Sequence, residues 1–299
     1  MKLLDPKLDV VFKLLFAHVN NRDILVSLLT AVLEPIAPIE TVEVLNPEIP
    51  RDLPADRGAL LDIHVRLSNG RHVDVEMQSE LHPSFTQRVL YYWARLHAAQ
   101  LSIGDCYEKL CPTVSIVFLN QSLLPTGRFH STFRVSEVYD HYDLSDALEL
   151  HFVELPKLKG GQGRDPLQRW MRFLLARNEK EFEELAMSDP DIRRAKEALT
   201  ALSLDPEAQE LARQREMAQI NFKLIRQFAR EEGEVIGEAR GRAESLRLAV
   251  ETACELLGVE IDTARRESLE ALDVAGLTAL LQGHRCERHW PGARILDPP

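Results

Sequence analysis

The chain has no long hydrophobic run and few cysteines, and each absence excludes common classes of protein. No stretch of its 299 residues approaches the 18 or more uncharged apolar residues of a membrane-spanning helix. The opening MKLLDPKLDVVFKLLF is charged too often to be the apolar part of a signal peptide. The four cysteines are Cys106, Cys111, Cys254 and Cys286. They form no C-x-x-C pair or disulfide-like spacing, so we expect reduced thiols and a cytoplasmic location.

The chain is also short of positive charge. It has 36 Lys and Arg against 47 Asp and Glu, which gives a formal net charge of −11. Residues 1–160 hold 15 basic and 21 acidic residues, and the rest holds 21 and 26, so the two parts carry −6 and −5. Neither part has the basic excess of a tight nucleic-acid binder. A nucleic-acid function would need a local basic patch, or carboxylates screened by a metal.

What the sequence does contain is enough apolar residues for an ordinary core, 45% of the chain. Asp5-Pro6 predicts a helix start, because an N-cap acceptor precedes a proline suited to the first helical position. RDILVSLLTAVL predicts a second helix that Glu34-Pro35 would end. Residues 35–59 are rich in proline and predict an irregular connector with a short strand in IETVEVL.

Strand-like segments dominate from there to about residue 160. The first is a strand, turn and strand, DIHVRLSNGRHVDVEMQ, at residues 62–78. FTQRVLYYWARLHAAQL then predicts a helix. Three further strand-like runs follow it: PTVSIVFLN, FHSTFRVSEV and ALELHFVELPKL. This order predicts an α+β module over residues 1–160.

Nearly everything after the glycine-rich KGGQGR, residues 159–164, predicts helix. Three Asp-Pro pairs mark helix starts: Asp165-Pro166, Asp189-Pro190 and Asp205-Pro206. Residues 206–257 could form one long helix, with three glycines spaced four apart on one face. Self-association through this helix and a plain solvated helix both remain open. We expect an all-α extension, with a long helix ending at 257 and a small helical cap with a loose tail over 258–299.

The hairpin at residues 62–78 has two possible turns. A two-residue loop at Asn69-Gly70 would mix apolar and polar side chains on both faces. A three-residue loop at Ser68-Asn69-Gly70 puts glycine where a left-handed residue follows a type I turn, and all apolar side chains on one face. A one-residue slip turns every side chain over, so burial favours the three-residue loop. This register pairs Ile63 with Val75 and His64 with Asp74.

The same register creates an acidic pair. Asp62 would lie directly opposite Glu76, with Cβ atoms about 5 Å apart, where like charges destabilise a sheet and raise each other's pKa. A divalent cation would remove both effects, because Mg²⁺, Mn²⁺ and Ca²⁺ take carboxylate oxygens as ligands. A solvent-facing sheet, with the pair screened by water, is the alternative. Gln78 could hydrogen-bond a water or a phosphate oxygen, and the Met77 carbonyl could be a third oxygen ligand.

These residues carry a family resemblance. Asp62, a turn and then VEMQ resembles the PD-(D/E)XK nuclease core, in the variant with glutamine at the usual lysine position. LLDPKLDVVFKLLF, DILVSLLTAVL, DVEMQ, RVLYYWARLHAAQL and YEKLCPTVSIVFL, in that order, resemble the Rpn family of recombination-promoting nucleases, also described as PD-(D/E)XK transposases. The resemblance covers roughly residues 3–160. It implies a restriction-endonuclease-like core, in which helices flank a central mixed sheet.

The resemblance also implies Mg²⁺-dependent cleavage of DNA, with Mn²⁺ as a possible substitute, and a link to recombination or mobile elements. The implied catalytic residues are Asp62, Glu76, Gln78, Asp9, Lys13, Arg88 and Tyr92, and the implied metal ligands are Asp62, Glu76, Met77 and Asp9. Without the resemblance, Asp9 and Lys13 would be a surface ion pair one helical turn apart. Arg88 and Tyr92 would be ordinary packing.

Gln78 leaves the activity open. A lysine stabilises charge that develops on the phosphate, whereas glutamine keeps a hydrogen bond and loses the charge. Arg88 or Lys13 could supply that charge, which would give an active enzyme. Otherwise the chain would be a slow or inactive relative that binds DNA or a protein. A further alternative is an interaction protein that forms homo-oligomers through its C-terminal helices.

Overall fold

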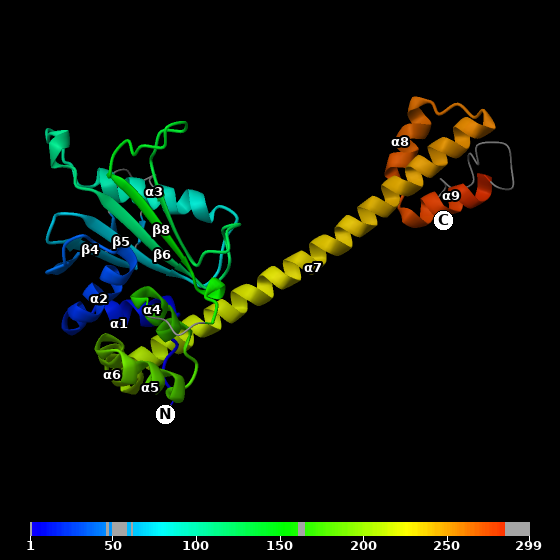
Figure 1. The fold of residues 1–299 in the computed structure, drawn as a ribbon. Helices are drawn as coiled ribbons and strands as arrows, with labels where there is room; N and C mark the ends of the chain where they lie inside the picture. The colour runs from blue at the N-terminus through cyan, green and yellow to red at the C-terminus, as the bar shows by residue number, and fades with distance from the viewer. Residues whose placement is uncertain (1, 46–47, 50–58, 61, 161–164, 285–299) are drawn as a thin grey trace. The chain divides into compact units, whose positions relative to one another are not determined.

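The computed structural model describes residues 2–45, 48–49, 59–60, 62–160 and 165–284. The chain forms two compact units, Met1–Met217 and Ala218–Pro299. Among the described residues, the strands lie in the first unit, and the second unit is helical (Figure 1). The helix α7 (Pro206–Leu257) begins in the first unit and ends in the second, over the residues that the sequence predicts for one long helix.

The first unit is built on a six-stranded sheet with the order β1-β4-β5-β6-β8-β7. Its strands are β1 (Val42–Leu45), β4 (Ile63–Leu67), β5 (His72–Gln78), β6 (Thr113–Leu119), β7 (His130–Arg134) and β8 (Leu148–Glu154). Strands β5, β6 and β8 are parallel, and the other pairings are antiparallel. Two short strands, β2 (Glu48–Ile49) and β3 (Ala59–Leu60), pair separately. The predicted mixed sheet is confirmed.

Helices cover both faces of the sheet (Figure 1). On one face lie α1 (Asp9–Phe16), α2 (Arg22–Leu33) and α4 (Pro166–Leu175), and on the other lies α3 (Phe85–Ala98). Strand β6 is buried along its whole length because it is central and covered on both sides. Its sequence TVSIVFL is accordingly a nearly continuous apolar run.

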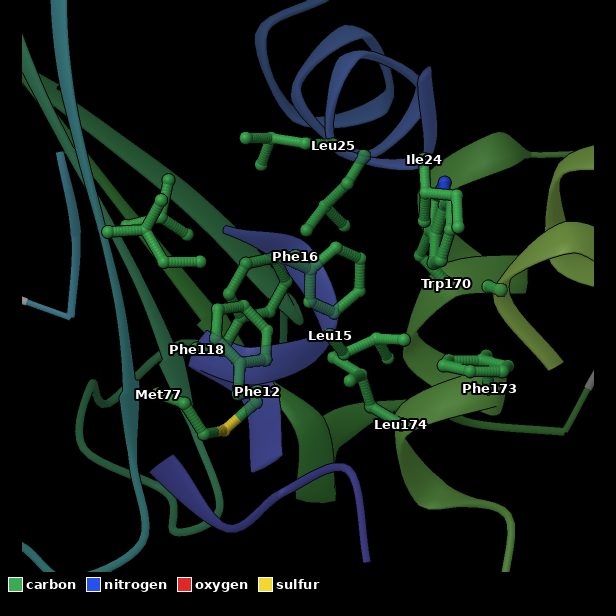
Figure 2. Close-up of a cluster of buried hydrophobic side chains, with 14 of the residues drawn as sticks. Phe12, Leu15, Phe16, Ile24, Leu25, Met77, Phe118, Trp170, Phe173 and Leu174 are labelled. Carbon is green, nitrogen blue, oxygen red and sulfur yellow. The ribbon is translucent and has the colours of Figure 1, made fainter. Parts of the chain in front are cut away.

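Aromatic side chains join the sheet to the helices that follow it in the chain. Phe12 and Phe16 of α1 lie 4.7 Å apart between ring centroids; Phe12 lies 5.8 Å from Phe118 of β6, and Phe16 lies 5.6 Å from Trp170 of α4 (Figure 2). Such tilted and edge contacts are favourable for aromatic rings. The helices α4, α5 (Glu179–Ser188) and α6 (Pro190–Leu204) therefore complete the core of the first unit. The domain boundaries expected at 160 and 257 stay predictions.

Most predicted helix starts are confirmed. Asp165 accepts the Leu167 N–H and Asp189 accepts the Asp191 N–H, so both cap helices that begin with proline. The start predicted at Asp5-Pro6 is wrong, because α1 begins at Asp9. The Asp5 side chain instead accepts the Lys7 N–H at 2.9 Å and forms a turn. Residues 161–164 of the glycine-rich segment lie outside the described residues.

The second unit has a small core of its own. The end of α7 packs with α8 (Thr263–Ala271) and α9 (Val274–His284), in the region where a small helical cap is expected. Its buried residues are Val250, Cys254, Leu269, Leu277 and Leu280. Arg247 donates to carbonyls at the end of α8, including Leu269 at 3.0 Å. Within the described part of the chain, no helix has the length and apolar character needed to cross a membrane.

The hairpin has the predicted register. Strands β4 and β5 pair Ile63 with Val75, His64 with Asp74, Val65 with Val73 and Arg66 with His72. The Leu67 N–H donates to the Arg71 carbonyl at 2.9 Å and closes a loop of residues 68–70. Gly70 has φ +84°, a left-handed conformation that favours glycine. The three-residue loop is thus confirmed.

Replacing Gly70 tests this turn. Gly70→Ala should lower the free energy of unfolding by about 1–2 kcal/mol, because alanine is strained in the left-handed region. Its Cβ would also lie 3.1 Å from the Cys111 Sγ atom. Gly127→Ala is the control, since no atom lies within 4 Å of its Cβ, and it should cost nothing. Urea unfolding followed by circular dichroism measures both, and equal stability of the two variants would contradict the turn assignment.

Candidate active site

Strand β5 runs past the end of its antiparallel partner, and the predicted site lies there. The β4–β5 ladder ends at Ile63 and Val75, whereas Glu76, Met77 and Gln78 continue along β6. Asp62 lies one residue before β4, in a bend. Its Oδ2 atom accepts the Met77 N–H at 2.9 Å. Asp62 therefore lies beside β5 as predicted, although as a side-chain partner of the backbone and not as a ladder pair of Glu76.

The Met77 carbonyl lies on the edge of β5 that faces Asp62. In a strand, the N–H and C=O groups of one residue point to the same edge. The Met77 N–H points toward Asp62, so its carbonyl lies on that side of β5. The Gln78 carbonyl points the other way and accepts the Asn120 N–H at 3.0 Å. The three predicted oxygen donors thus come from one short stretch of the sheet.

The acidic face of the hairpin is buried. Asp74 is 2% exposed and Glu76 7% exposed. Helix α3 lies over this side of the sheet, where Trp93 donates to the Thr113 carbonyl at 2.9 Å. The alternative of a solvent-facing sheet, with its charges screened by water, is therefore wrong for these residues.

Burial shifts the pKa values of the three carboxyl groups upward. Burial is the main cause for Asp62, where it raises the pKa to about 6, and the charge of Asp9 adds to it. Burial and then the Asp62 charge raise the pKa of Glu76 to about 7. Burial, with the charges of Glu76 and Asp62, raises the pKa of Asp74 well above its usual range. Without a cation, this part of the sheet therefore holds protons unusually tightly.

Gln78, Arg88 and Tyr92 come together at the same place. The Gln78 Oε1 atom accepts a hydrogen bond from the Arg88 guanidinium at 2.6 Å, and its amide nitrogen donates to the Glu80 carbonyl. The guanidinium lies 4.0 Å from the Glu76 carboxylate. It also lies 5.8 Å from the centre of the Tyr92 ring. Helix α3 thus places the Arg88 guanidinium next to Glu76 and Gln78, and its role there stays a prediction.

Asp9 and Lys13 of α1 are close enough to Asp62 to interact with it electrostatically. Both affect the pKa of Asp62, which Asp9 raises and Lys13 lowers. Asp9 is not paired with Lys13 as a surface pair would be; its carboxylate accepts the Arg215 Nε–H at 2.7 Å. Arg215 was not predicted as a site residue, since it lies on α7, 206 residues from Asp9. No local motif marks it, apart from buried alanines at helical spacing before it.

The donor set fits a divalent cation that keeps part of its water. Among the described residues, no group of three or more His, Cys, Asp and Glu is arranged to hold a metal ion. Mg²⁺ seldom needs one, because it binds through one or two carboxylates and fills its other positions with water and substrate phosphates. Asp62 and Glu76 are the two carboxylates here that such an ion would need. The Oδ1 atom of buried Asp74 has no hydrogen-bond partner among the described residues, so the site is short of positive charge.

A second polar cluster lies at the opposite end of the parallel strands. His130 and His151 share a hydrogen bond of 2.9 Å, and His151 contacts Glu149 at 2.7 Å. Arg71 and Arg134 pair with the same glutamate at 3.0 and 3.4 Å. The hydrogen-bonding and charged groups of this cluster pair with one another. We therefore interpret the cluster as a structural network that connects β7 to the rest of the sheet.

Of the comparisons with known proteins, the comparison with protein-family models gives a match. A family model described as "PD-(D/E)XK nuclease family transposase" matches residues 6–225. No curated protein and no solved structure matches. The matched span contains the sheet, the acidic end of β5 and the beginning of α7 with Arg215.

Because the pKa of Glu76 is raised, replacing this glutamate with an uncharged residue should increase the stability of the protein at neutral and higher pH. Its pKa rises from 4.5 to about 7 on folding, so the folded state keeps a proton that the unfolded state has lost. The wild type therefore loses stability as pH rises from about 4.5 to 7. In EDTA, the free energy of unfolding of Glu76→Gln should equal that of the wild type at pH 4. At pH 8 it should be higher than that of the wild type by up to about 3 kcal/mol.

Denaturant titrations at the two pH values, in EDTA, measure this difference. Glu40→Gln is the control, because Glu40 is exposed and its replacement should leave the pH profile unchanged. A Glu76→Gln variant less stable than the wild type at pH 8 would contradict the burial of an uncompensated charge.

Proposed function

Because the chain belongs to the PD-(D/E)XK nuclease family transposase family, we propose that it hydrolyses DNA phosphodiester bonds with a divalent cation, Mg²⁺ first and Mn²⁺ as a substitute. The observation that carries this proposal is the set of buried carboxyl groups at the end of β5, where the strand extends past β4. Recombination or mobile-element biology would be its setting. Strand joining is not part of the proposal.

In this mechanism, the carboxylates of Asp62 and Glu76 and the Met77 carbonyl would hold the cation. When bound, the cation would supply Lewis acidity at the phosphate and favour ionisation of the attacking water. Asp9, whose charge acts on Asp62, would strengthen the negative electrostatic potential around the cation. Lys13 would face the phosphate from the same helix, one turn further on.

Gln78 acts here by positioning Arg88. Its Oε1 atom fixes the guanidinium, which also lies 5.3 Å from the Phe85 ring and close to Tyr92. The arginine then provides the positive charge that the glutamine lacks, next to Glu76. A preorganised cation at this point would stabilise the charge that develops on the phosphate. The glutamine variant of the motif is in this way compatible with catalysis.

A second candidate is a relative that binds the cation and DNA but cleaves slowly or not at all. Both ends of the Gln78 amide are engaged, by Arg88 and by the Glu80 carbonyl. This leaves the amide poorly placed to orient an attacking water. The net charge of −11 also disfavours tight DNA binding.

We also propose that the second unit forms homo-oligomers. On α7, Ile220, Leu224 and Phe228 follow one another at intervals of four and lie on one helix face. All three are exposed, Phe228 by 65%. A row of large apolar side chains on a solvent-exposed helix is typical of a helix–helix interface.

Cleavage of supercoiled plasmid tests the nuclease proposal. With Mg²⁺, the wild type should nick or linearise the plasmid, and Asp62→Ala and Glu76→Ala should each lose about a hundredfold or more of the rate, as when a preorganised charged group is removed. Glu40→Ala, on the surface, should cleave like the wild type. Equal nicking by the wild type and both site variants would reject the assignment.

Calorimetric titration with Mg²⁺ separates the two candidates. An enzyme should bind Mg²⁺ and cleave. A relative that cleaves slowly or not at all should bind Mg²⁺ through Asp62 and Glu76 without measurable cleavage. Loss of binding in Glu76→Ala identifies the same site in either case, and unchanged binding in that variant would place the cation elsewhere.

Light scattering of the full chain tests the oligomer. Replacing Ile220, Leu224 and Phe228 together with glutamate should reduce the measured mass to that of one chain, because charged side chains cannot be buried unpaired. The control replaces Lys223, Arg226 and Arg230 with glutamine, on other faces of the same segment. A wild type that is already monomeric at high concentration would refute the proposal.

A further inference from the structure

Helix α7 brings an arginine into the acidic site. The Arg215 Nε atom donates to one carboxylate oxygen of Asp9 at 2.7 Å, and a terminal guanidinium nitrogen pairs with the other oxygen. This two-point contact requires the planar fork of arginine, which lysine does not have. It joins residues 206 positions apart in the chain. The first helix of the fold and the last helix of the first unit therefore meet at the site.

Packing fixes where Arg215 lies. Ala208 and Ala212 are buried, and Ala212 belongs to the main core of the first unit. Arg215 follows Ala212 by three positions and Ala208 by seven, so it lies on the same face of α7. The start of the helix is held as well, since Asp205 accepts the Glu207 N–H at 3.0 Å. A rigid, packed helix thus presents the guanidinium to Asp9.

The charge of Arg215 reaches beyond Asp9. Arg215, like Lys13 and Asp9, is close enough to Asp62 to interact electrostatically with its carboxylate. Arg215 is also 45% exposed, so a substrate could reach its guanidinium. Its partner Asp9 is only 21% exposed. One side of the guanidinium is therefore committed to the protein and the other side faces solvent.

The site as a whole has more carboxyl groups than cations. Its carboxyl groups are Asp9, Asp62, Asp74 and Glu76, and its cations are Lys13, Arg88 and Arg215. Gln78, in the lysine position, contributes none. Without Arg215 the set would carry an extra negative charge, which would attract a metal ion and repel the phosphates of DNA.

We propose that Arg215 is the cation by which α7 completes the active site: it holds Asp9 in place and presents positive charge to the DNA phosphate. This inference rests on the proposed nuclease function and goes beyond it, because it makes the helical extension part of the site. Arg215 is a positioning residue toward Asp9 and a binding residue toward the substrate.

Arg215→Gln tests this role through two opposite changes. Removing one positive charge should tighten Mg²⁺ binding about three- to tenfold in calorimetry, through the lost repulsion. It should weaken binding of a short DNA duplex, measured with Ca²⁺ in place of Mg²⁺. The slope of log affinity against log salt should fall by about 1, as expected when one phosphate contact is lost. Arg215→Lys keeps the charge and loses the two-point contact, so its values should lie between.

Arg213→Gln is the matched control. Arg213 lies on the opposite face of the same helix and pairs with Glu210 at 2.7 Å, so its replacement should leave both affinities near those of the wild type. Arg215→Gln values equal to those of this control would overturn the inference while leaving the nuclease proposal intact. Parallel weakening of both Mg²⁺ and DNA binding, with a lower unfolding temperature, would also overturn it, since a purely structural role gives that result. A wild type that binds no Mg²⁺ would remove the proposed function and this inference together.

Discussion

Burial of negative charge at the end of a central strand is the constraint on which the rest of the structure depends. Asp74 and Glu76 lie under α3, and Asp62 lies against the backbone of the same strand. Removing carboxylates from water is costly unless protons, cationic side chains or a metal ion neutralise them. The raised pKa values show that the side chains alone leave the charge incompletely balanced. A divalent cation is the partner that such a group of oxygen atoms suits.

The fold brings the compensating charges from three helices. Helix α1 buries Phe12 and Phe16 in the core and turns Asp9 and Lys13 toward the site. Helix α3 supplies Arg88, which Gln78 holds. The pairing of β4 with β5 ends at Ile63 and Val75. The edge of β5 beside Met77 therefore has no strand partner on that side, and the Asp62 side chain binds there. The helices after residue 160 belong to this arrangement, since they share the core through Trp170 and lead to α7.

The sequence predicted the parts of this site that depend on local rules. Gly70 and the alternation of apolar residues determined the hairpin register, and hence that Asp62 lies near Glu76. Proline after aspartate located three helix starts, although at Asp5-Pro6 the same signal produced a turn. The burial of Asp74 could not be read from a strand that alternates polar and apolar residues, because that pattern is typical of a half-exposed sheet. The contact of Arg215 with Asp9 could not be predicted from the sequence, because two residues 206 positions apart share no local spacing pattern.

The most direct measurement is anomalous X-ray diffraction from a crystal soaked in Mn²⁺. We expect a manganese peak bonded to carboxylate oxygens of Asp62 and Glu76, at about 2.0–2.2 Å, with water in the remaining positions. Its absence from these residues at saturating Mn²⁺, or a peak only at Glu149 and His151 at the other end of the sheet, would contradict the central claim that the buried carboxyl groups at the end of β5 form a metal site.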